Sequence, residues 1–250
     1  MGFKDHFSEQ AGAYARYRPD YPDALFAYLA SLTAAHERAW DCATGNGQAA
    51  HALVRHFARV VATDPSERQL AHAVPHPRIT FRTEPAEATS LEAASVDLVT
   101  VAQALHWFDF DRFFAEVRRV LKPEGVLAVW GYQVIRVTPA VDAVIERYYR
   151  EILGPYWPPE RWYFEGGYRV PFPFPRLETP VFHLEDTWGP EEVIGYLGTW
   201  SGSLRFRKER GEDPLETIRE DLMTAWGDAG RRRVWWPLHL HVARPGADGQ

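Results

Sequence analysis

The sequence lacks most of the features of secreted, membrane-bound and nucleic-acid-binding proteins. Cys42 is its only cysteine, so no disulfide and no thiolate metal site can form within one chain, and we expect a reducing, cytoplasmic setting. No apolar run is long enough to span a bilayer, and the charged residues 1–10 are no signal peptide, so no membrane partner is expected. Acidic residues outnumber basic ones by 34 to 28, and the net charge of −6 argues against a general nucleic-acid partner.

Aromatic residues are what the chain has in excess. They make up 14% of the sequence and include 10 Trp, whereas the hydrophobic fraction of 46% and the charged fraction of 25% are ordinary. A length of 250 residues fits one α/β domain with an elaborated cap. The surplus of aromatic side chains favours a large apolar pocket for a small molecule.

Short apolar runs alternate with helical patterns up to about residue 132, which is typical of a parallel sheet covered by helices. The expected strands are Ala39–Cys42, Arg59–Thr63, Ile79–Thr83, Val96–Ala102 and Val126–Trp130. The clearest helix follows Asp109, a suitable cap, and stops at Pro123 and Gly125. Right-handed crossovers place the ends of the first, second and fourth strands along one edge of the sheet.

Beyond residue 132 the pattern changes. Helices are expected at Pro139–Ile152, Glu191–Leu197 and Pro214–Trp226, and late strands at Val181–Thr187 and Leu238–Val242. The Pro- and aromatic-rich stretch 154–175 is too apolar for disorder, so we expect an ordered insertion. Two basic clusters are expected to be solvated loop charges, although either could steer an anionic substrate. They are Arg205, Arg207, Lys208 and Arg210, and Arg231–Arg233.

The most informative motif is AWDCATGNG, residues 39–47. Asp41 ends a strand and leads into a turn in which Gly45 and Gly47 leave bare backbone for a ligand. The helix that follows points its first N–H groups at the same place. Asp64 ends the next strand, at about the interval of 20 residues at which a carboxylate accepts hydrogen bonds from both ribose hydroxyls. The motif therefore predicts a nucleoside pocket.

Two cofactor classes fit these residues. Residues 45–50 match the permissive G-x-G-x-x-[GA] form of nicotinamide dinucleotide sites, but Asp41 beside the turn would repel a pyrophosphate. A methyl donor with a positive sulfonium and ammonium suits carboxylates and aromatic faces. We favour the methyl donor, and an NAD-dependent oxidoreductase is the less favoured alternative.

Four segments together resemble S-adenosylmethionine-dependent methyltransferases of the Rossmann-like class I, and are most similar to the small-molecule, trans-aconitate-type (type 11) enzymes. They are DCATGNG, VVATDPS, SVDLVTVAQALHWFD and FFAEVRRVLKPEGVLAVW. The resemblance implies a seven-stranded α/β sheet with helices on both faces and a final antiparallel hairpin. FSEQAGAYARYRPDYP, residues 7–22, resembles the lid that covers the donor. The first glycine of the family's D-x-G-x-G-x-G pattern is Ala43 here.

The resemblance divides the chain into a lid (1–36), a donor-binding core (37–132), the rest of the core with the aromatic-rich cap (133–243) and a flexible tail (244–250). It implies S-adenosyl-L-methionine as cofactor and S-adenosyl-L-homocysteine as product. The implied donor contacts are Asp41, Ala43, Thr44, Gly45, Asn46, Gly47, Asp64, Pro65, Ser66, Gln69, Ala86, Glu87, Gln103, Ala104, Trp107, Tyr17 and Arg18. In this scheme Asp41 holds the methionine part, Asp64 the ribose and Glu87 the adenine.

Some of these residues also have a plain structural interpretation. Asp64 could instead cap the next helix at Ser66. Glu87 could equally be a solvated carboxylate in a polar loop. The lid residues, such as Arg18, could be a helix surface with extended side chains.

The histidines have structural interpretations as well. His106 is the candidate catalytic base, although packing beneath Trp107 is the commoner role for a histidine in an apolar cluster. His239 and His241 alternate on a strand, but no third ligand is apparent nearby, so no metal is expected.

The expected reaction is direct in-line transfer of a methyl group to a small-molecule acceptor, with alignment in a dry pocket as the main source of rate. A carboxylate acceptor would need an anchor such as Arg18, whereas a phenol or amine would need His106 or a tyrosine as base. The expected acceptor wall consists of Tyr14, Tyr21, Trp130, Tyr132, Trp157 and Trp200. The alternative is a donor-binding protein without turnover, and we expect a monomer or homodimer.

Overall fold

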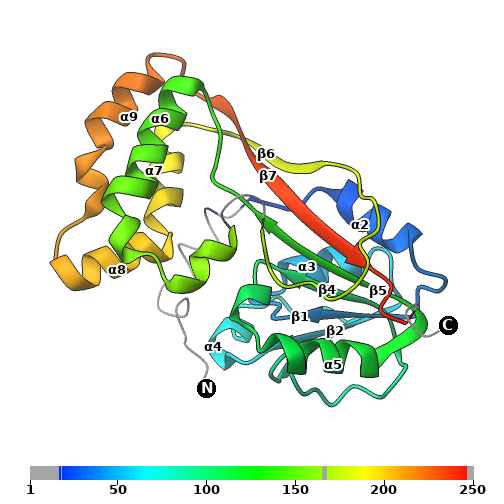
Figure 1. Cartoon of the computed structure of the whole chain (residues 1–250). Helices are drawn as coiled ribbons and strands as arrows, with labels where there is room; N and C mark the ends of the chain where they lie inside the picture. The colour runs from blue at the N-terminus through cyan, green and yellow to red at the C-terminus, as the bar shows by residue number, and fades with distance from the viewer. Residues whose placement is uncertain (1–16, 18, 165–167, 247–250) are drawn as a thin grey trace.

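The structure, a computed structural model, describes residues 17, 19–164 and 168–246. Its centre is a seven-stranded sheet in the order β3-β2-β1-β4-β5-β7-β6 (Figure 1). The strands are β1 (Arg38–Cys42), β2 (Arg59–Asp64), β3 (Ile79–Thr83), β4 (Val96–Ala102), β5 (Leu121–Tyr132), β6 (Phe182–Trp188) and β7 (Arg232–Ala243). β1 to β5 pair in parallel, whereas β7 is antiparallel to both β5 and β6. The expected α/β sheet with a final antiparallel hairpin is confirmed.

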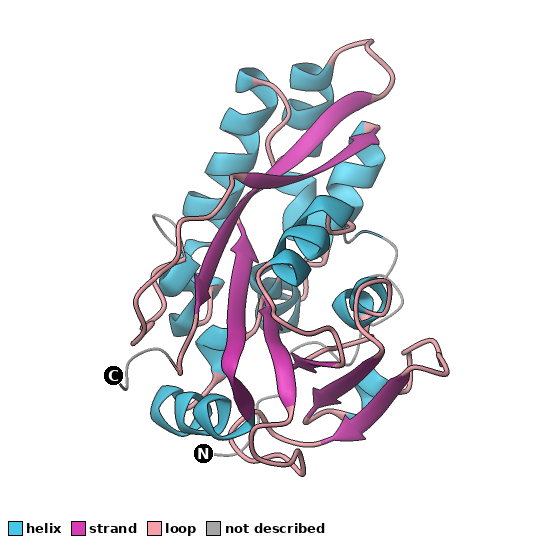
Figure 2. Cartoon of the chain, turned by 90° about the vertical axis from the view of Figure 1, so that its right-hand side faces the viewer, coloured by secondary structure: helices cyan, strands magenta, loops and turns pink. Residues whose placement is uncertain are grey.

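Helices lie on both faces of the sheet and beyond one end of it (Figure 2). They are α2 (Asp23–Ser31), α3 (Gln48–Leu53), α4 (Glu67–Leu70), α5 (Phe110–Val120), α6 (Pro139–Arg147), α7 (Pro190–Gly198), α8 (Ser201–Arg210) and α9 (Arg219–Trp226). The short turns are η2 (Leu105–Trp107), η3 (Tyr148–Ile152), η4 (Gly154–Tyr156), η5 (Pro159–Phe164) and η6 (Pro214–Thr217). Within the described ranges no helix combines the length and the apolar character needed to cross a membrane.

Neighbouring residues of a strand point to opposite faces of the sheet. Helices cover both faces here, so apolar side chains lie on both. In β4, Leu98 belongs to the core that α2 and α3 share with the sheet, and Val99 belongs to the core beneath α5. Phe113 and Val117 of α5 are fully buried in this second core. The central strands are therefore fixed on both sides, and only their ends and the loops that follow them are available for a site.

β6 and β7 extend past the parallel strands, and α6 to α9 pack around this extension to form the cap (Figures 1 and 2). The interior of the cap is aromatic. The rings of Trp188 and Trp236 lie 4.9 Å apart, and the Tyr196 ring lies 5.5 Å from Trp236. Part of the aromatic surplus thus forms the core of the cap. The sequence interpretation had assigned the whole surplus to a ligand pocket.

The expectation of loops around the two basic clusters is wrong for all of their residues except Arg231, which precedes β7. Residues 205–210 belong to α8, in which Arg205 Nε donates to Glu209 Oε1 at 2.7 Å, one turn further on. Gly211 ends this helix with a φ of 73°. Arg232 and Arg233 begin β7, where Arg233 pairs with Glu185 of β6. The sequence did not indicate this helix because α8 has no wide apolar stripe, which is the usual signal of a helix. Its charged side chains pair along the helix without such a stripe.

Candidate functional site

The carboxyl ends of β1, β2 and β4 lie side by side at one edge of the sheet. Cys42, the last residue of β1, is in register with Thr63 of β2 and with Val101 of β4. The strand order reverses between β1 and β4, and ligands of open α/β sheets bind at such a reversal. Asp41, Asp64 and the segment after β4 therefore converge, as the alternation of strands and helices predicted.

The turn after β1 uses left-handed backbone. The φ angles are 53° at Ala43, 58° at Gly45 and 88° at Gly47. A Cβ atom at Gly47 would lie 2.9 Å from the Phe81 ring, so a side chain there meets both a clash and an unfavourable φ. Asn46 lies between the two glycines, half-buried. Because α3 begins directly after the turn, bare backbone and the first turn of a helix face the same edge.

Ala43 stands where the family pattern has glycine, and its φ of 53° is one that glycine adopts without strain. Left-handed alanine costs roughly 1–2 kcal/mol, whereas glycine costs roughly 0.5–1 kcal/mol through the entropy of the unfolded chain. Ala43→Gly should therefore keep or raise the free energy of unfolding, by at most about 1.5 kcal/mol, in urea titrations. Ala43→Val is the control and should be less stable than the wild type. A clearly destabilised Ala43→Gly variant would show that the turn is not strained at this residue.

Asp41 is a buried carboxylate, only 1% exposed. Its Oδ1 accepts from Thr100 Oγ1 at 2.8 Å and its Oδ2 from Thr44 Oγ1 at 2.5 Å. Burial raises the pKa of Asp41 to about 6, although the bonds from Thr44 and Thr100 and the backbone of Ala50 act against burial. Such a carboxylate is poorly solvated, and a cationic group of a ligand would compensate for the lost water.

Asp64 fills the capping role that was left open for it. Its Oδ2 accepts from Gly45 N at 2.9 Å and its Oδ1 accepts from Ser66 N at 2.9 Å. Ser66 in turn caps α4, because its Oγ accepts from Gln69 N at 3.4 Å. A carboxylate oxygen can accept more than one hydrogen bond, so this role is compatible with ribose binding. Pro65 is half-buried between these two residues.

Glu87 lies in the loop after β3. Burial is the main cause that raises the pKa of the Cys42 thiol, and the negative charges of Asp41, Glu87 and Asp64 raise it further. Glu87 Oε1 also accepts from Asp109 N at 3.0 Å, which ties the loop after β3 to the start of α5. Glu87 thus has a structural partner and is not simply solvated, and Ala86 beside it is buried.

The end of β4 is also strained. Gln103 has a φ of 57°, its N donates to Trp130 O at 2.8 Å and its side chain reaches Tyr132 O at 3.3 Å. These bonds fix the backbone of β4 against β5 at the point where a donor would lie. Ala104, which is buried, directly precedes the 3-10 turn η2, and its carbonyl oxygen accepts from Trp107 N at 2.9 Å.

His106 lies in an aromatic environment. Its ring is 4.6 Å from that of Trp107 and 6.2 Å from that of Tyr168, centre to centre. Burial lowers the pKa of His106 to about 3, and the positive charge of Arg161 contributes in the same direction. An imidazole with such a pKa is neutral at pH 7 and a weak proton acceptor. The packing role of His106 is therefore favoured over that of a general base.

The six residues of the expected acceptor wall do not form one group. Tyr21 lies against Trp130 at 5.5 Å and against Tyr132 at 6.4 Å, at the end of β5. Trp157 and Trp200 lie 5.7 Å from each other in the cap, where the Trp157 indole donates to a backbone carbonyl. The structure thus brings three of these residues together at the sheet edge and two in the cap. Tyr14 and Arg18 lie outside the described residues.

The residues that the sequence interpretation missed are Thr100 and Tyr168. Thr100 could have been found, because an alternating strand places it beside Asp41 on β4. Tyr168 gives no local signal: it is 1% exposed, its ring stacks 6.0 Å from that of His241, and its carbonyl lies 2.9 Å from His241 Nε2. Burial holds the pKa of the Tyr168 hydroxyl far above its usual range. Among the described residues no group of His, Cys, Asp and Glu is arranged to hold a metal.

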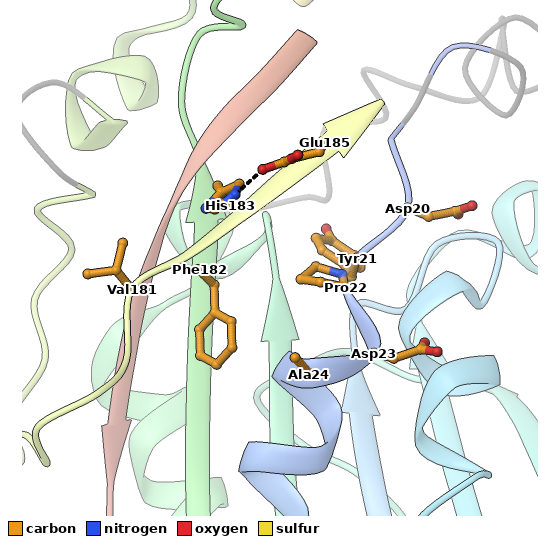
Figure 3. Close-up of a pocket in the computed structure, with 9 residues that line it drawn as sticks. All are labelled: Asp20, Tyr21, Pro22, Asp23, Ala24, Val181, Phe182, His183 and Glu185. Carbon is orange, nitrogen blue, oxygen red and sulfur yellow. Dashed lines mark hydrogen bonds and ion pairs between the residues drawn. The ribbon is translucent and has the colours of Figure 1, made fainter. Parts of the chain in front are cut away.

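A separate pocket lies between the start of α2 and the edge strand β6 (Figure 3). Its lining residues are Asp20, Tyr21, Pro22, Asp23, Ala24, Val181, Phe182, His183 and Glu185. Its acidic groups have partners within the protein: Asp23 pairs with Arg55 at 2.7 Å, and Glu185 pairs with His183 and Arg233. Of the residues that the sequence predicted for the site, only Tyr21 lines this pocket.

Together the fold and the site define a class of protein. Five parallel strands followed by an antiparallel hairpin, with acidic residues at the ends of β1 and β2 around a glycine turn, are the arrangement of class I methyltransferases. Comparison with known proteins agrees, because residues 40–129 match the model of the methyltransferase domain family.

Similar proteins extend this match to nearly the whole chain. A "putative methyltransferase" of Dictyostelium discoideum is 33% identical over 251 residues, which cover 97% of this chain and 95% of that protein. An uncharacterised methyltransferase of Mycobacterium tuberculosis is 41% identical over 222 residues, 87% of this chain and 86% of its own length. The solved structure of a "putative Type II methyltransferase" from Anaeromyxobacter dehalogenans aligns with a TM-score of 0.86 and 47% identity, over 92% of this chain and 98% of that one. The chain belongs to the class I S-adenosylmethionine-dependent methyltransferases.

Proposed function

We propose that the protein transfers the methyl group of S-adenosylmethionine to a small-molecule acceptor by direct displacement. The observation that carries the proposal is the buried Asp41 carboxylate beside the left-handed Gly45–Gly47 turn. A donor with an ammonium group fits this site, because it offers a positive charge to a carboxylate that has lost its water. A pyrophosphate would bring negative charge to the same place, so the site argues against a dinucleotide.

In this proposal the chain's own residues bind and orient the donor. Asp41 accepts hydrogen bonds from the ammonium, and Asp64 accepts from the ribose hydroxyls while it holds Gly45 N and Ser66 N. Ala86 and Glu87 lie at the adenine, and Gln103, fixed against β5, lies beside the sulfonium. S-adenosylmethionine supplies a methyl group activated by positive sulfur.

The acceptor would lie at the end of β5, against Tyr21, Trp130 and Tyr132. The Trp130 indole N–H is buried, and it has no hydrogen-bond partner anywhere in the described part of the chain. An unsatisfied buried donor costs about 1–3 kcal/mol, and an oxygen atom of the acceptor would satisfy it. An indole N–H only donates, so it favours an acceptor that presents a lone pair.

Rate would come from alignment and from exclusion of water rather than from proton transfer. His106, with a pKa of about 3, is a weak base, and Tyr168 stays a phenol because burial raises its pKa. The acceptor's lone pair forms the new bond to the methyl carbon as the carbon–sulfur bond breaks. The electron pair of the broken bond stays on sulfur. Holding two reactants in this geometry supplies up to about 7–11 kcal/mol.

The proposal is tested by calorimetric titration of the purified protein with S-adenosylmethionine, S-adenosylhomocysteine and NAD. We expect the first two to bind and NAD not to bind at the same concentrations. Methyl transfer to members of a panel of small acids, alcohols and amines, followed by mass spectrometry, then identifies the acceptor. Binding of NAD in place of the sulfonium compound would indicate an oxidoreductase. Donor binding without product across the panel would favour a sensor.

A further inference from the structure

A glycine in the cap is shaped to receive the ring of Tyr17. Gly195 lies in the middle of α7, and an ideal Cβ atom built on it would lie 2.5, 2.7 and 2.8 Å from three carbons of the Tyr17 ring. Real Cβ atoms do not approach other carbons so closely, so a Cβ atom at this position would force the ring to move. Only glycine at position 195 therefore allows the ring to lie where it does.

A glycine in the middle of α7 calls for a structural explanation, and the contact with Tyr17 provides one. Glycine in a helix interior is unfavourable relative to alanine, because its backbone loses more freedom on folding. Gly195 has no positive φ that would require glycine, in contrast to Gly45 or Gly47. The close approach of Tyr17 to the α7 backbone is the feature of this position that an alanine would abolish.

Residues 19–22 contact the start of α3, directly after the glycine turn. We call residues 19–22 the strap. The side chain of Gln48, the first residue of α3, donates to Pro19 O at 3.0 Å and to Asp20 Oδ1 at 2.9 Å. The Tyr21 ring packs on Trp130 at 5.5 Å. Tyr17 and the strap therefore contact three parts of the molecule: Tyr17 lies against α7 of the cap, and the strap contacts the helix that follows the glycine turn and the end of β5.

We propose that Gly195 is a positioning residue: its bare backbone seats Tyr17 and thereby holds the strap over the donor turn and the cap against the core. The inference rests on the proposed function, because the strap then retains the donor and shields the acceptor from water at the same time. Gly195 itself touches neither ligand. We call the contact between the Gly195 backbone and the Tyr17 ring the seat. The seat couples donor binding to the position of the cap, which carries Trp157 and Trp200.

The decisive variant is Gly195→Ala. The added methyl group displaces the Tyr17 ring, so fewer molecules hold the strap in place and the apparent Kd for S-adenosylmethionine rises in proportion. If about one molecule in ten still holds the strap in place, the apparent Kd should rise roughly tenfold. The melting temperature should not fall, because alanine is the better helix former. Gly189→Ala, at the start of the same helix, is the matched control, since its Cβ would meet nothing closer than 3.5 Å.

A double-variant cycle assigns the effect to the Tyr17 ring. In a Tyr17→Ala background the seat is empty of its ring, so adding Gly195→Ala should change donor affinity no further. An additional loss in that background, or wild-type affinity in Gly195→Ala alone, overturns the proposal.

Hydrogen exchange of the ligand-free protein separates this inference from the proposed function. The amides of Tyr17, Asp20, Tyr21, Asp23 and Ala24 should exchange faster in Gly195→Ala than in the wild type or Gly189→Ala, whether or not any donor binds. If S-adenosylmethionine fails to bind the wild type while this difference is present, the proposed function fails and the seat stands. Equal exchange in all three proteins overturns the seat.

Discussion

Asp41→Asn should bind S-adenosylmethionine roughly 100-fold more weakly than the wild type, which corresponds to about 3 kcal/mol, and should nevertheless melt at a higher temperature at pH 7. The affinity falls because a buried carboxylate that bonds the donor's ammonium is replaced by a neutral amide. Calorimetric titration and thermal unfolding of the two proteins measure both effects.

The gain in stability follows from the burial of the charge. Raising the pKa of Asp41 from 3.8 to about 6 makes its ionised form about 3 kcal/mol less favourable in the fold than in the unfolded chain. Asparagine avoids this cost and keeps an oxygen for Thr44 or Thr100. Wild-type affinity in the variant, or an unchanged melting temperature, would contradict the assigned role.

The same carboxylate sets a pH dependence that serves as a control. Its folded pKa lies above its unfolded one, so between about pH 4 and pH 6 the folded protein binds more protons. The free energy of unfolding from this group therefore falls as pH rises through that window and is constant above it. The cationic donor binds the ionised form, so wild-type affinity should fall about tenfold for each pH unit below about 6. The Asn variant should lack this component.

The sequence predicted the convergence of the acidic strand ends well because its signals there are local. A strand that leads through Asp41 into a glycine turn can be recognised from a few residues, and Asp109 can be recognised as a helix cap in the same way. The parallel connections then place Asp41 and Asp64 on neighbouring strands without further information. Strand ends were less well predicted: β5 begins at Leu121, which pairs with Val96 before a register shift that no local pattern reveals.

The positions of the residues predicted to form the acceptor wall were harder to predict, because contacts between distant segments determine them. Trp157 and Trp200 look equivalent to Trp130 in the sequence, yet they pack in the cap while Trp130 lies at the end of β5. The position of Tyr168 depends on His241, 73 residues further along the chain. Neither partner shows a periodicity that indicates the other.

His106 shows a different limit of sequence interpretation. Its residue type allowed both a base and a packed ring, and neighbouring residues could not decide between them. The decision depends on burial between Trp107 and Tyr168 and on the charge of Arg161, which together lower the pKa to about 3. Solvation is a property of the whole fold and has no local signature.

Asp64→Ala is expected to weaken donor binding by roughly 1–3 kcal/mol, about 5- to 150-fold, because the ribose hydroxyls lose their acceptor. The variant should also be less stable, since Gly45 N and Ser66 N lose the partner that joins the glycine turn to α4. A smaller affinity could therefore reflect a displaced turn instead of a lost ribose contact. An S-adenosylhomocysteine analogue without the 2′-hydroxyl distinguishes the two explanations. Removing the hydroxyl should weaken binding to the wild type but should cost the Ala variant little, because the interaction is already absent. An equal loss in both proteins would restrict Asp64 to its capping role and place the ribose elsewhere along the edge of the sheet.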